Sequence, residues 1–185
     1  LSSAASDVYK RQAKEALSDS KIEINDENAD RVGVIIGSCV GGAISIQNFF
    51  TAYEENPEKA DKSDIIKMPI GAIANNIAKI SGAKGVVTNV GNACAASTIS
   101  IEYACDLIRA GVGDAFIVGG SDSFSALAFG GFTALHALDT DPCSPYNKSK
   151  GITLGEGAAV LVVESYEHAV ARGARIYCDV LGGGI

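Results

Sequence analysis

The chain has few basic side chains, no long apolar run and no closely paired cysteines, and each of these shortages excludes a class of protein. Its 15 Lys and Arg are outnumbered by 22 Asp and Glu, which gives a net charge of -7. Binding to nucleic acid depends on clustered basic side chains, so we expect no nucleic-acid partner. No apolar stretch approaches the roughly 20 residues that span a bilayer, so we expect no membrane partner.

Cysteine usage argues against a metal cage and against a disulfide framework. The chain has an odd number of cysteines and no C-x-x-C pair; the five are Cys39, Cys94, Cys105, Cys143 and Cys178. Zinc cages and secreted disulfide scaffolds rely on close pairs and on even numbers of cysteines. We therefore expect no bound metal and a reducing, cytoplasmic location.

What the chain does have is enough apolar sequence for one folded core. Of its 185 residues 47% are apolar and 20% are charged, which is typical of a globular domain. Residues 1–12 (LSSAASDVYKRQ) do not join smoothly to the pattern that follows. We interpret them as a non-native, adapter-derived segment, and residues 13–185 as a single domain.

Short apolar segments alternate with helical patterns along this domain. Strands that are apolar on both faces are predicted over residues 31–36, 86–90, 115–118, 160–164 and 176–181. Helices are predicted over residues 13–20, 44–54, 69–80, 94–110 and 166–171, and a charged surface loop over 54–67. This alternation implies an α/β fold whose sheet is covered on both faces. Because the pattern starts inside a helix and stops after a strand, we also expect a fragment that is cut at both ends.

Cys94 follows a predicted buried strand and stands at the predicted start of a helix. Gly91 turns the chain there, and Ala93, Ala95 and Ala96 keep the surroundings of the sulfur small. A helix start carries unpaired N–H groups and a partial positive charge, which favour thiolate over thiol and stabilise a developing oxyanion. The pattern favours acyl-thioester chemistry at Cys94. A small core residue is the alternative, and local physics alone favours neither.

The helix after Cys94 is predicted to bury one face. Four of its residues share that face through their three- and four-residue spacing: Ile101, Ala104, Cys105 and Ile108. We expect each of the other four cysteines, Cys105 among them, to be a small core residue.

Several motifs, in the same order along the chain, resemble the β-ketoacyl synthase family. The cysteine motif Val90–Thr98 (VGNACAAST) is similar to its active-site signature, and Gly33–Gly42 (GVIIGSCVGG) to its first glycine-rich strand and turn. Gly111–Ser121 resembles the strand after the nucleophile helix, and Phe129–Leu138 the loop toward the dimer partner. Ser144–Ala158 (SPYNKSKGITLGEGA) resembles the family's run that ends in GEGA.

The resemblance implies a thiolase-like αβαβα sandwich made of two related halves, of which this chain supplies the N-terminal half. It implies a 3-oxoacyl-[acyl-carrier-protein] synthase of fatty-acid or polyketide synthesis, which loads an acyl group onto Cys94 and condenses it with a malonyl group. The implied partners are an acyl carrier protein, acyl and malonyl thioesters and a second copy of the chain. The strand near Phe116–Gly119 would pair across the two-fold axis. No cofactor is implied.

The GEGA run supplies the remaining candidate residues. Ile152 stands where the family usually has a phenylalanine that borders the active site, so it is a candidate substrate-binding residue. Gly155, Glu156 and Gly157 match the family and are expected to form a structural loop of the active site. Between glycines, Glu156 is expected to accept hydrogen bonds from backbone N–H groups rather than to act as a base.

The chain contains two histidines, His136 and His168, and neither lies in a motif like those of the family's catalytic histidines. The family's catalytic histidines and lysine belong to its C-terminal half, so we expect a nucleophile without the decarboxylation machinery. Three alternatives remain. They are a non-catalytic chain-length-type partner subunit, another thiolase-fold acyltransferase, and a cysteine hydrolase, which would need a histidine partner.

Overall fold

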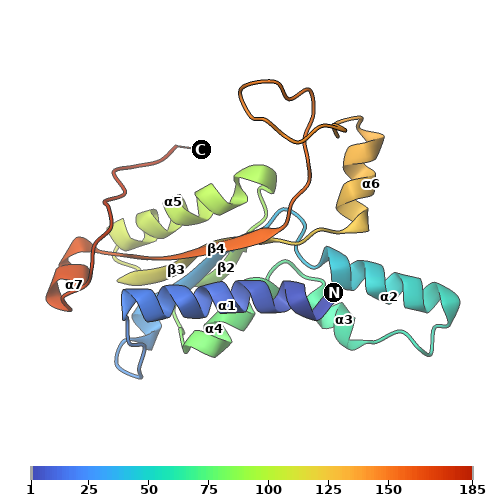
Figure 1. Ribbon diagram of the computed structural model, residues 1–185. Helices are drawn as coiled ribbons and strands as arrows, with labels where there is room; N and C mark the ends of the chain where they lie inside the picture. The colour runs from blue at the N-terminus through green and yellow to red at the C-terminus, as the bar shows by residue number, and fades with distance from the viewer. Residues whose placement is uncertain (1, 185) are drawn as a thin grey trace.

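One mixed four-stranded sheet forms the centre of the molecule (Figure 1). The computed structural model describes residues 2–184, with side chains from residue 8 onward. The strands are β1 (Val32–Gly37), β2 (Val87–Val90), β3 (Ala115–Asp122) and β4 (Gly157–Glu164), arranged in the order β2-β1-β3-β4. β1 runs parallel to β2 and β3, whereas β4 runs antiparallel to β3. The predicted α/β class is confirmed.

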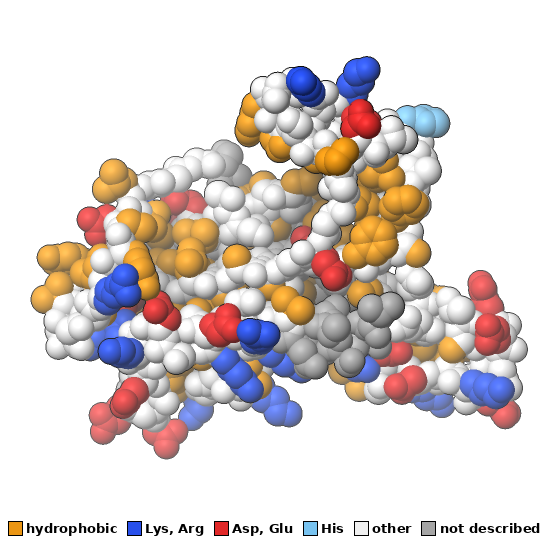
Figure 2. Space-filling model, viewed as in Figure 1, with side chains coloured by type: hydrophobic (Ala, Val, Ile, Leu, Met, Phe, Trp, Pro, Cys, Tyr) orange, Lys and Arg blue, Asp and Glu red, His pale blue; other side chains and the backbone are white. Residues whose placement is uncertain are grey.

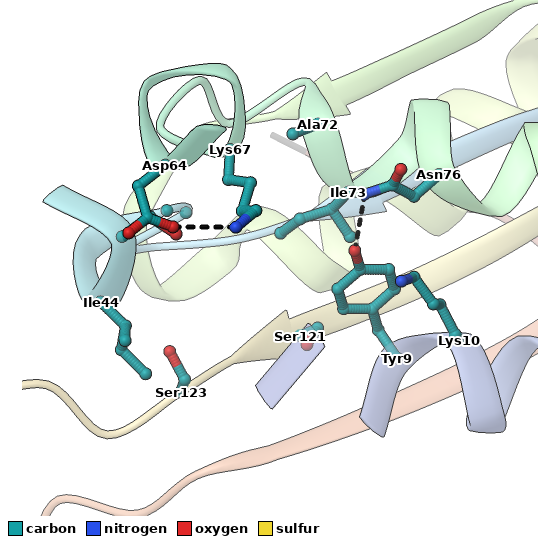
Figure 3. A pocket seen from close by; sticks show the side chains of 13 residues that line it. Tyr9, Lys10, Ile44, Asp64, Lys67, Ala72, Ile73, Asn76, Ser121 and Ser123 are labelled. Atoms are coloured by element: carbon teal, nitrogen blue, oxygen red, sulfur yellow. Dashed lines mark hydrogen bonds and ion pairs between the residues drawn. The ribbon is translucent and has the colours of Figure 1, made fainter. Parts of the chain in front are cut away.

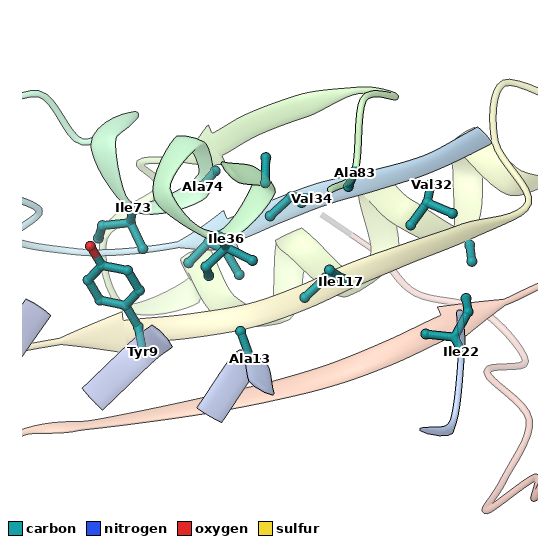
Figure 4. Packing of buried hydrophobic residues seen from close by; sticks show 13 residues of the cluster. Tyr9, Ala13, Ile22, Val32, Val34, Ile36, Ile73, Ala74, Ala83 and Ile117 are labelled. Carbon is teal, nitrogen blue, oxygen red and sulfur yellow. The ribbon is translucent and has the colours of Figure 1, made fainter. Parts of the chain in front are cut away.

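Helices cover both faces of this sheet, as predicted. They are α1 (Ser2–Ser20), α2 (Ala43–Glu55), α3 (Ser63–Lys67), α4 (Ala72–Ser81), α5 (Ala96–Arg109), α6 (Ala126–Ala134) and α7 (Tyr166–Ala171), with 3-10 turns at Ala29–Arg31 and Ala93–Ala95. α1 and α4 pack on one face, against Val34 and Ile36 (Figure 4). α5 packs on the other, against Ile35, because successive side chains of a strand point to opposite faces. Within residues 2–184 no helix is both long and apolar enough to cross a bilayer.

Two predictions of secondary structure are wrong. Residues 176–181 are irregular rather than a strand. They border a groove beside α5, β4 and α7. No described strand forms backbone hydrogen bonds of a sheet with them. The charged stretch 54–67 is not a loop throughout, because it contains α3. The Asp61 side chain accepts a hydrogen bond from the backbone N–H of Ser63 at 2.8 Å, and such local side-chain bonds start short helices.

The place of β3 in the sheet corrects the expected dimer contact. Phe116 of β3 is paired in register with Gly33 of β1 on one side and with Val163 of β4 on the other. A strand whose two edges are both occupied has no free N–H and C=O groups for a partner strand. β3 therefore cannot pair across a two-fold axis, and the outer strands of the described sheet are β2 and β4.

α1 contains much of the segment that is predicted to be non-native. Tyr9 is only 7% exposed, and its hydroxyl accepts a hydrogen bond from the side-chain amide of Asn76 at 2.8 Å. Ala13 is fully buried one turn later. The segment is therefore compatible with the fold, and the origin of residues 1–12 stays a prediction.

An ion-pair group joins the end of β4 to α7 and to the end of α1. Glu164 pairs with Arg172 and lies 2.7 Å from Nδ1 of His168. Arg172 also donates to the carbonyl oxygen of Ser20 at 2.7 Å. Burial opposes the ionisation of Glu164, but hydrogen bonds from Arg172 and His168 outweigh it and lower the pKa of Glu164. His168 thus contributes a structural hydrogen bond to this group.

This group predicts an acid-sensitive contribution to stability. Glu164→Gln should lower the free energy of unfolding by about 2 kcal/mol near neutral pH, because it leaves Arg172 without its charged partner. Since the folded-state pKa of Glu164 is lowered, its contribution is complete above the ordinary range of a glutamate carboxyl and is lost as the pH falls through the lowered pKa. Urea unfolding at neutral and at acid pH measures this difference.

The matched control is Glu58→Gln, since Glu58 is exposed on a loop and should contribute almost nothing. A loss for Glu164→Gln that is the same at both pH values would contradict the assigned role.

Candidate active site

Cys94 lies in a tight turn between the end of β2 and the start of α5. Residues Ala93–Ala95 form a 3-10 turn, and α5 begins at Ala96 rather than at Cys94. Ala93 has a φ of +48°, a left-handed conformation that costs a residue with a Cβ on the order of 1–2 kcal/mol. The turn leaves Cys94 exposed. The predicted sharp passage from strand to helix is present, and the regular α-helix begins two residues later than predicted.

Two glycines let the start of α5 lie directly against the ends of the neighbouring strands. A Cβ on Gly37, at the end of β1, would overlap the backbone of Ala96 and Ser97. A Cβ on Gly120, in β3, would overlap the Ser97 side chain. One turn further along α5, the buried Ser100 hydroxyl lies 2.9 Å from the carbonyl oxygen of Gly119. These contacts position the turn that carries Cys94 against the sheet.

The backbone donors at the start of α5 are used in part by the preceding 3-10 turn, where the N–H groups of Ala95 and Ala96 donate to the carbonyl oxygens of Asn92 and Ala93. Within the described chain no side chain caps this helix at Ala95. The first N–H groups of an α-helix have no partner inside the helix and carry a partial positive charge. Small side chains at Ala93 and Ala95 leave the approach to Cys94 open. The arrangement is suited to a nucleophile whose carbonyl adduct places negative charge near those N–H groups.

Asp122, which no sequence motif indicated, anchors the neighbouring loop. Its carboxylate accepts hydrogen bonds from the Ser38 hydroxyl at 2.8 Å and from the backbone N–H groups of Cys39 and Val40 at 2.8 and 3.0 Å. The Ser38 hydroxyl oxygen accepts in turn from the N–H of Gly41 at 2.8 Å. Ser38 follows β1 and Asp122 ends β3, and only the pairing of these two strands in the structure brings the two residues together.

Glu156 and its flanking glycines lie where a loop enters β4. The Glu156 carboxylate accepts a hydrogen bond from the backbone N–H of Phe124 at 3.2 Å and so ties this loop to the segment after β3. That contact is of the kind expected for a carboxylate between glycines. Gly155 and Gly157 are exposed, with open space where a Cβ would stand. Their place in an active site stays a prediction.

Ile152 lies further up the same loop and is 38% exposed. Its N–H donates to the carbonyl oxygen of Ala137 at 2.9 Å, and its carbonyl oxygen accepts from the N–H of Asp139 at 3.1 Å. These contacts close the base of the loop that spans residues 138–152 and do not involve Cys94. The expected substrate-binding role of Ile152 therefore stays a prediction.

The exposure of the other cysteines differs from the expectation in three of four cases. Cys105 is buried in α5, as predicted. The burial prediction is wrong for Cys39, Cys143 and Cys178, which are exposed. Each of the three lies outside regular structure, in the loop after β1, in the 138–152 loop and in the irregular segment after α7. No described element covers these segments, so an individual cysteine in them stays exposed even though cysteine is often a small core residue.

Two hollows lie elsewhere on the molecule. One, of about 460 Å³, is lined by residues of α1, α2 and α4, among them Tyr9, Ile44 and Ile73 (Figure 3); it depends in part on the segment predicted to be non-native. The other, of about 600 Å³, lies between α5, β4 and residues 175–181. Cys94 lines neither hollow. Over residues 2–184 no three His, Cys, Asp or Glu side chains come together as a metal site.

Comparison with known sequences gives one consistent family. Residues 5–169 match the family model described as "Beta-ketoacyl synthase, N-terminal domain". The 3-oxoacyl-[acyl-carrier-protein] synthase 2 of Vibrio cholerae is 37% identical over 180 residues, which cover 92% of this chain and 44% of that protein. The enzyme of the same name from Staphylococcus aureus strain N315 is 38% identical over 183 residues, which cover 93% and 44%. The chain thus spans about 44% of the length of these relatives.

Solved structures give the same answer for the fold. The ishigamide ketosynthase/chain length factor superposes with a TM-score of 0.83 at 33% identity, over 97% of this chain and 45% of that one. A type II polyketide synthase acyl-carrier protein in complex with its ketosynthase, AntDE:AntF, gives 0.84 at 27% identity, over 94% and 46%. The predicted thiolase-like fold is confirmed, over about half of each neighbouring chain.

The contact between α5 and β1 predicts a severe effect of one added methyl group. Gly37→Ala should lower the free energy of unfolding by about 3 kcal/mol, because the backbone of Ala96 and Ser97 has to move away from the new Cβ. Gly130→Ala on α6 is the control, since its Cβ would enter open space and alanine favours a helix. Urea unfolding compares the two, and equal stability for both variants would show that the contact does not hold α5 in place.

Proposed function

Since the chain belongs to the β-ketoacyl synthase family, we propose that it supplies the acyl-carrying cysteine, Cys94, of a 3-oxoacyl-[acyl-carrier-protein] synthase. The observation that carries the proposal is the position of Cys94, which is exposed in the turn directly ahead of α5, a helix whose start no described side chain caps. The relatives from Vibrio cholerae and Staphylococcus aureus bear this activity in their names. The pathway would be fatty-acid or polyketide synthesis.

The proposed reaction has two steps that share one electrophilic carbon. The Cys94 thiolate first attacks the carbonyl carbon of an acyl thioester, and the carrier thiol leaves with a proton. A malonyl thioester then loses carbon dioxide, and its carbanion attacks the Cys94 thioester; a carbon–carbon bond forms and the sulfur leaves as thiolate. In both steps the N–H groups at the start of α5 would hold the negative charge on the carbonyl oxygen.

The proposal assigns to this chain the groups for acyl loading but not those for decarboxylation. Cys94 and the helix start would perform loading, whereas decarboxylation needs groups that neither His136 nor His168 supplies. His136 is exposed at the end of α6 and has a φ of +53°, and His168 is engaged with Glu164. Gly155, Glu156 and Gly157 would support the site as a structural loop, and Ile152 would contact the acyl chain.

We propose that an acyl carrier protein delivers both the acyl and the malonyl thioesters. The solved complex of a type II polyketide synthase acyl-carrier protein with its ketosynthase supports this partner. The five free cysteines support a reducing, cytoplasmic setting for the reaction.

We further propose that the working form is a homodimer in which α6 is covered by the second copy. α6 is apolar along its whole length and buries none of its residues. Leu127 on α6 is 61% exposed and Leu135 at its end is 73% exposed, and Figure 2 shows hydrophobic side chains gathered over this helix. An exposed apolar patch of this kind is typical of an interface. Phe129–Leu138 is also the stretch that resembles the family's loop toward the dimer partner.

Acyl transfer to the chain tests the proposed function. The chain is incubated with acyl carrier protein that bears an acyl group, and the adduct is located by intact mass and peptide mapping. We expect one acyl group on Cys94, none in Cys94→Ala, and unchanged loading in Cys143→Ala, whose cysteine is exposed but lies far from the turn in sequence. With malonyl carrier protein added, we expect no 3-oxoacyl product from this chain.

Acylation that persists in Cys94→Ala would overturn the assignment of the nucleophile. A measurable condensation rate from this chain would contradict the claim that it lacks the groups for decarboxylation. Product formation by a complete enzyme that is unaffected by Cys94→Ala would instead favour the non-catalytic partner subunit.

A further inference from the structure

A second exposed cysteine, Cys39, leaves the sheet beside Cys94. Gly37 and Val90 are register partners on the parallel strands β1 and β2, and the N–H of Ser38 donates to the carbonyl oxygen of Val90 at 3.1 Å. Both strands therefore end at the same edge of the sheet. Cys39 comes two residues after the end of β1 and Cys94 four residues after the end of β2.

The two turns do not diverge after they leave the sheet. The backbone of Ala96 and Ser97 lies so close to Gly37 that no Cβ fits between them. The turn that carries Cys94 therefore folds back over the end of β1. On the other side, Asp122 holds the backbone N–H of Cys39 at 2.8 Å and fixes where the Cys39 side chain begins.

The electrostatics agree with this proximity. Partial burial raises the pKa of the Cys39 thiol first, the Asp122 carboxylate raises it further, and the negative charge of a Cys94 thiolate also contributes. The last effect requires that the two sulfurs lie within electrostatic reach of each other. Cys39 thus begins beside the proposed nucleophile, which is the position that a resolving cysteine takes.

We propose that Cys39 and Cys94 form a dithiol that hydrogen peroxide closes to an intramolecular disulfide. The Cys94 thiolate attacks one peroxide oxygen, the O–O bond breaks, and Cys94 becomes a sulfenic acid as hydroxide leaves. The Cys39 sulfur then attacks the Cys94 sulfur, the S–O bond breaks, and the released hydroxide takes up the thiol proton of Cys39 to form water. The hydroxide from the first step takes up the proton that Cys94 released when it became a thiolate, so the two thiols together have lost two hydrogen atoms and peroxide has become two waters.

The consequence is a reversible block of the nucleophile. In the disulfide Cys94 has no free thiol and cannot accept an acyl group. A dithiol reductant restores the Cys94 thiol. A disulfide also protects the sulfur from the irreversible sulfinic and sulfonic acids. The disulfide chemistry itself does not depend on the proposed acyl transfer, so the two proposals fail separately.

Peptide-resolved mass spectrometry of the peroxide-treated chain tests the dithiol. The reduced chain is exposed to hydrogen peroxide, free thiols are alkylated, and linked peptides are identified before and after reduction. We expect one linked pair, Cys39 with Cys94, that reduction separates. Cys39→Ser should abolish the pair and leave Cys94 as a sulfenic acid that dimedone captures. Cys143→Ser, which removes another exposed thiol, should leave the pair unchanged.

Oxidation of a mixture of nitrogen-15-labelled and unlabelled chains shows whether the bond lies within one chain. A linked pair that joins labelled to unlabelled peptide would overturn the proposal, since the bond would then join two copies. Oxidised Cys94 in the unaltered chain with Cys39 still free to alkylate would overturn it as well. Loss of acyl transfer in the preceding experiment, with the linked pair still formed, would count against the proposed function alone.

Discussion

The close contact between the start of α5 and the ends of β1 and β3 is the constraint on which the candidate site depends. A helix normally packs on a sheet at a distance set by its side chains. Here Gly37 and Gly120 have none, so the backbone of Ala96 comes directly against the end of β1, and the Ser97 side chain comes directly against β3. That approach forces the chain to turn sharply between β2 and α5. Ala93 adopts a left-handed conformation within the turn, and Cys94 is left exposed with the N–H groups of the helix behind it.

The edge of the sheet from which the Cys94 turn leaves also gathers two carboxylates that order loops. β1, β2 and β3 run parallel, so their carboxyl ends meet there. Asp122 at the end of β3 holds the loop after β1 through three donors. Glu156, ahead of β4, holds the segment after β3 through the N–H of Phe124. Each carboxylate accepts hydrogen bonds from backbone N–H groups, and together they hold the loop after β1 and the segment after β3.

Local patterns in the sequence were enough to predict the buried strand β1 and the tight turn between β2 and α5. They did not predict the contacts between distant segments. The run Val32–Gly37 is buried throughout, and its β-branched side chains showed that helices cover both faces. The small residues around Cys94 indicated a tight turn. Residues 176–181 have equally good strand character but pair with no described strand, and periodicity does not reveal whether an apolar run finds a pairing partner. The interior position of β3 and the role of Asp122 depend on which strands adjoin, so they too were beyond a local pattern.

The relative alkylation rates of the five cysteines test the central claim that the turn before α5 presents an activated nucleophile. The fully reduced chain is treated with iodoacetamide, and the modified fraction of each cysteine is followed by peptide mass spectrometry. Cys39, Cys143 and Cys178 are exposed like Cys94, so exposure alone would make the four react alike. The structure predicts that Cys94 is alkylated first and Cys105 last. Labelling spread evenly over the exposed cysteines would contradict the account, because Cys94 would then be no more than an accessible thiol.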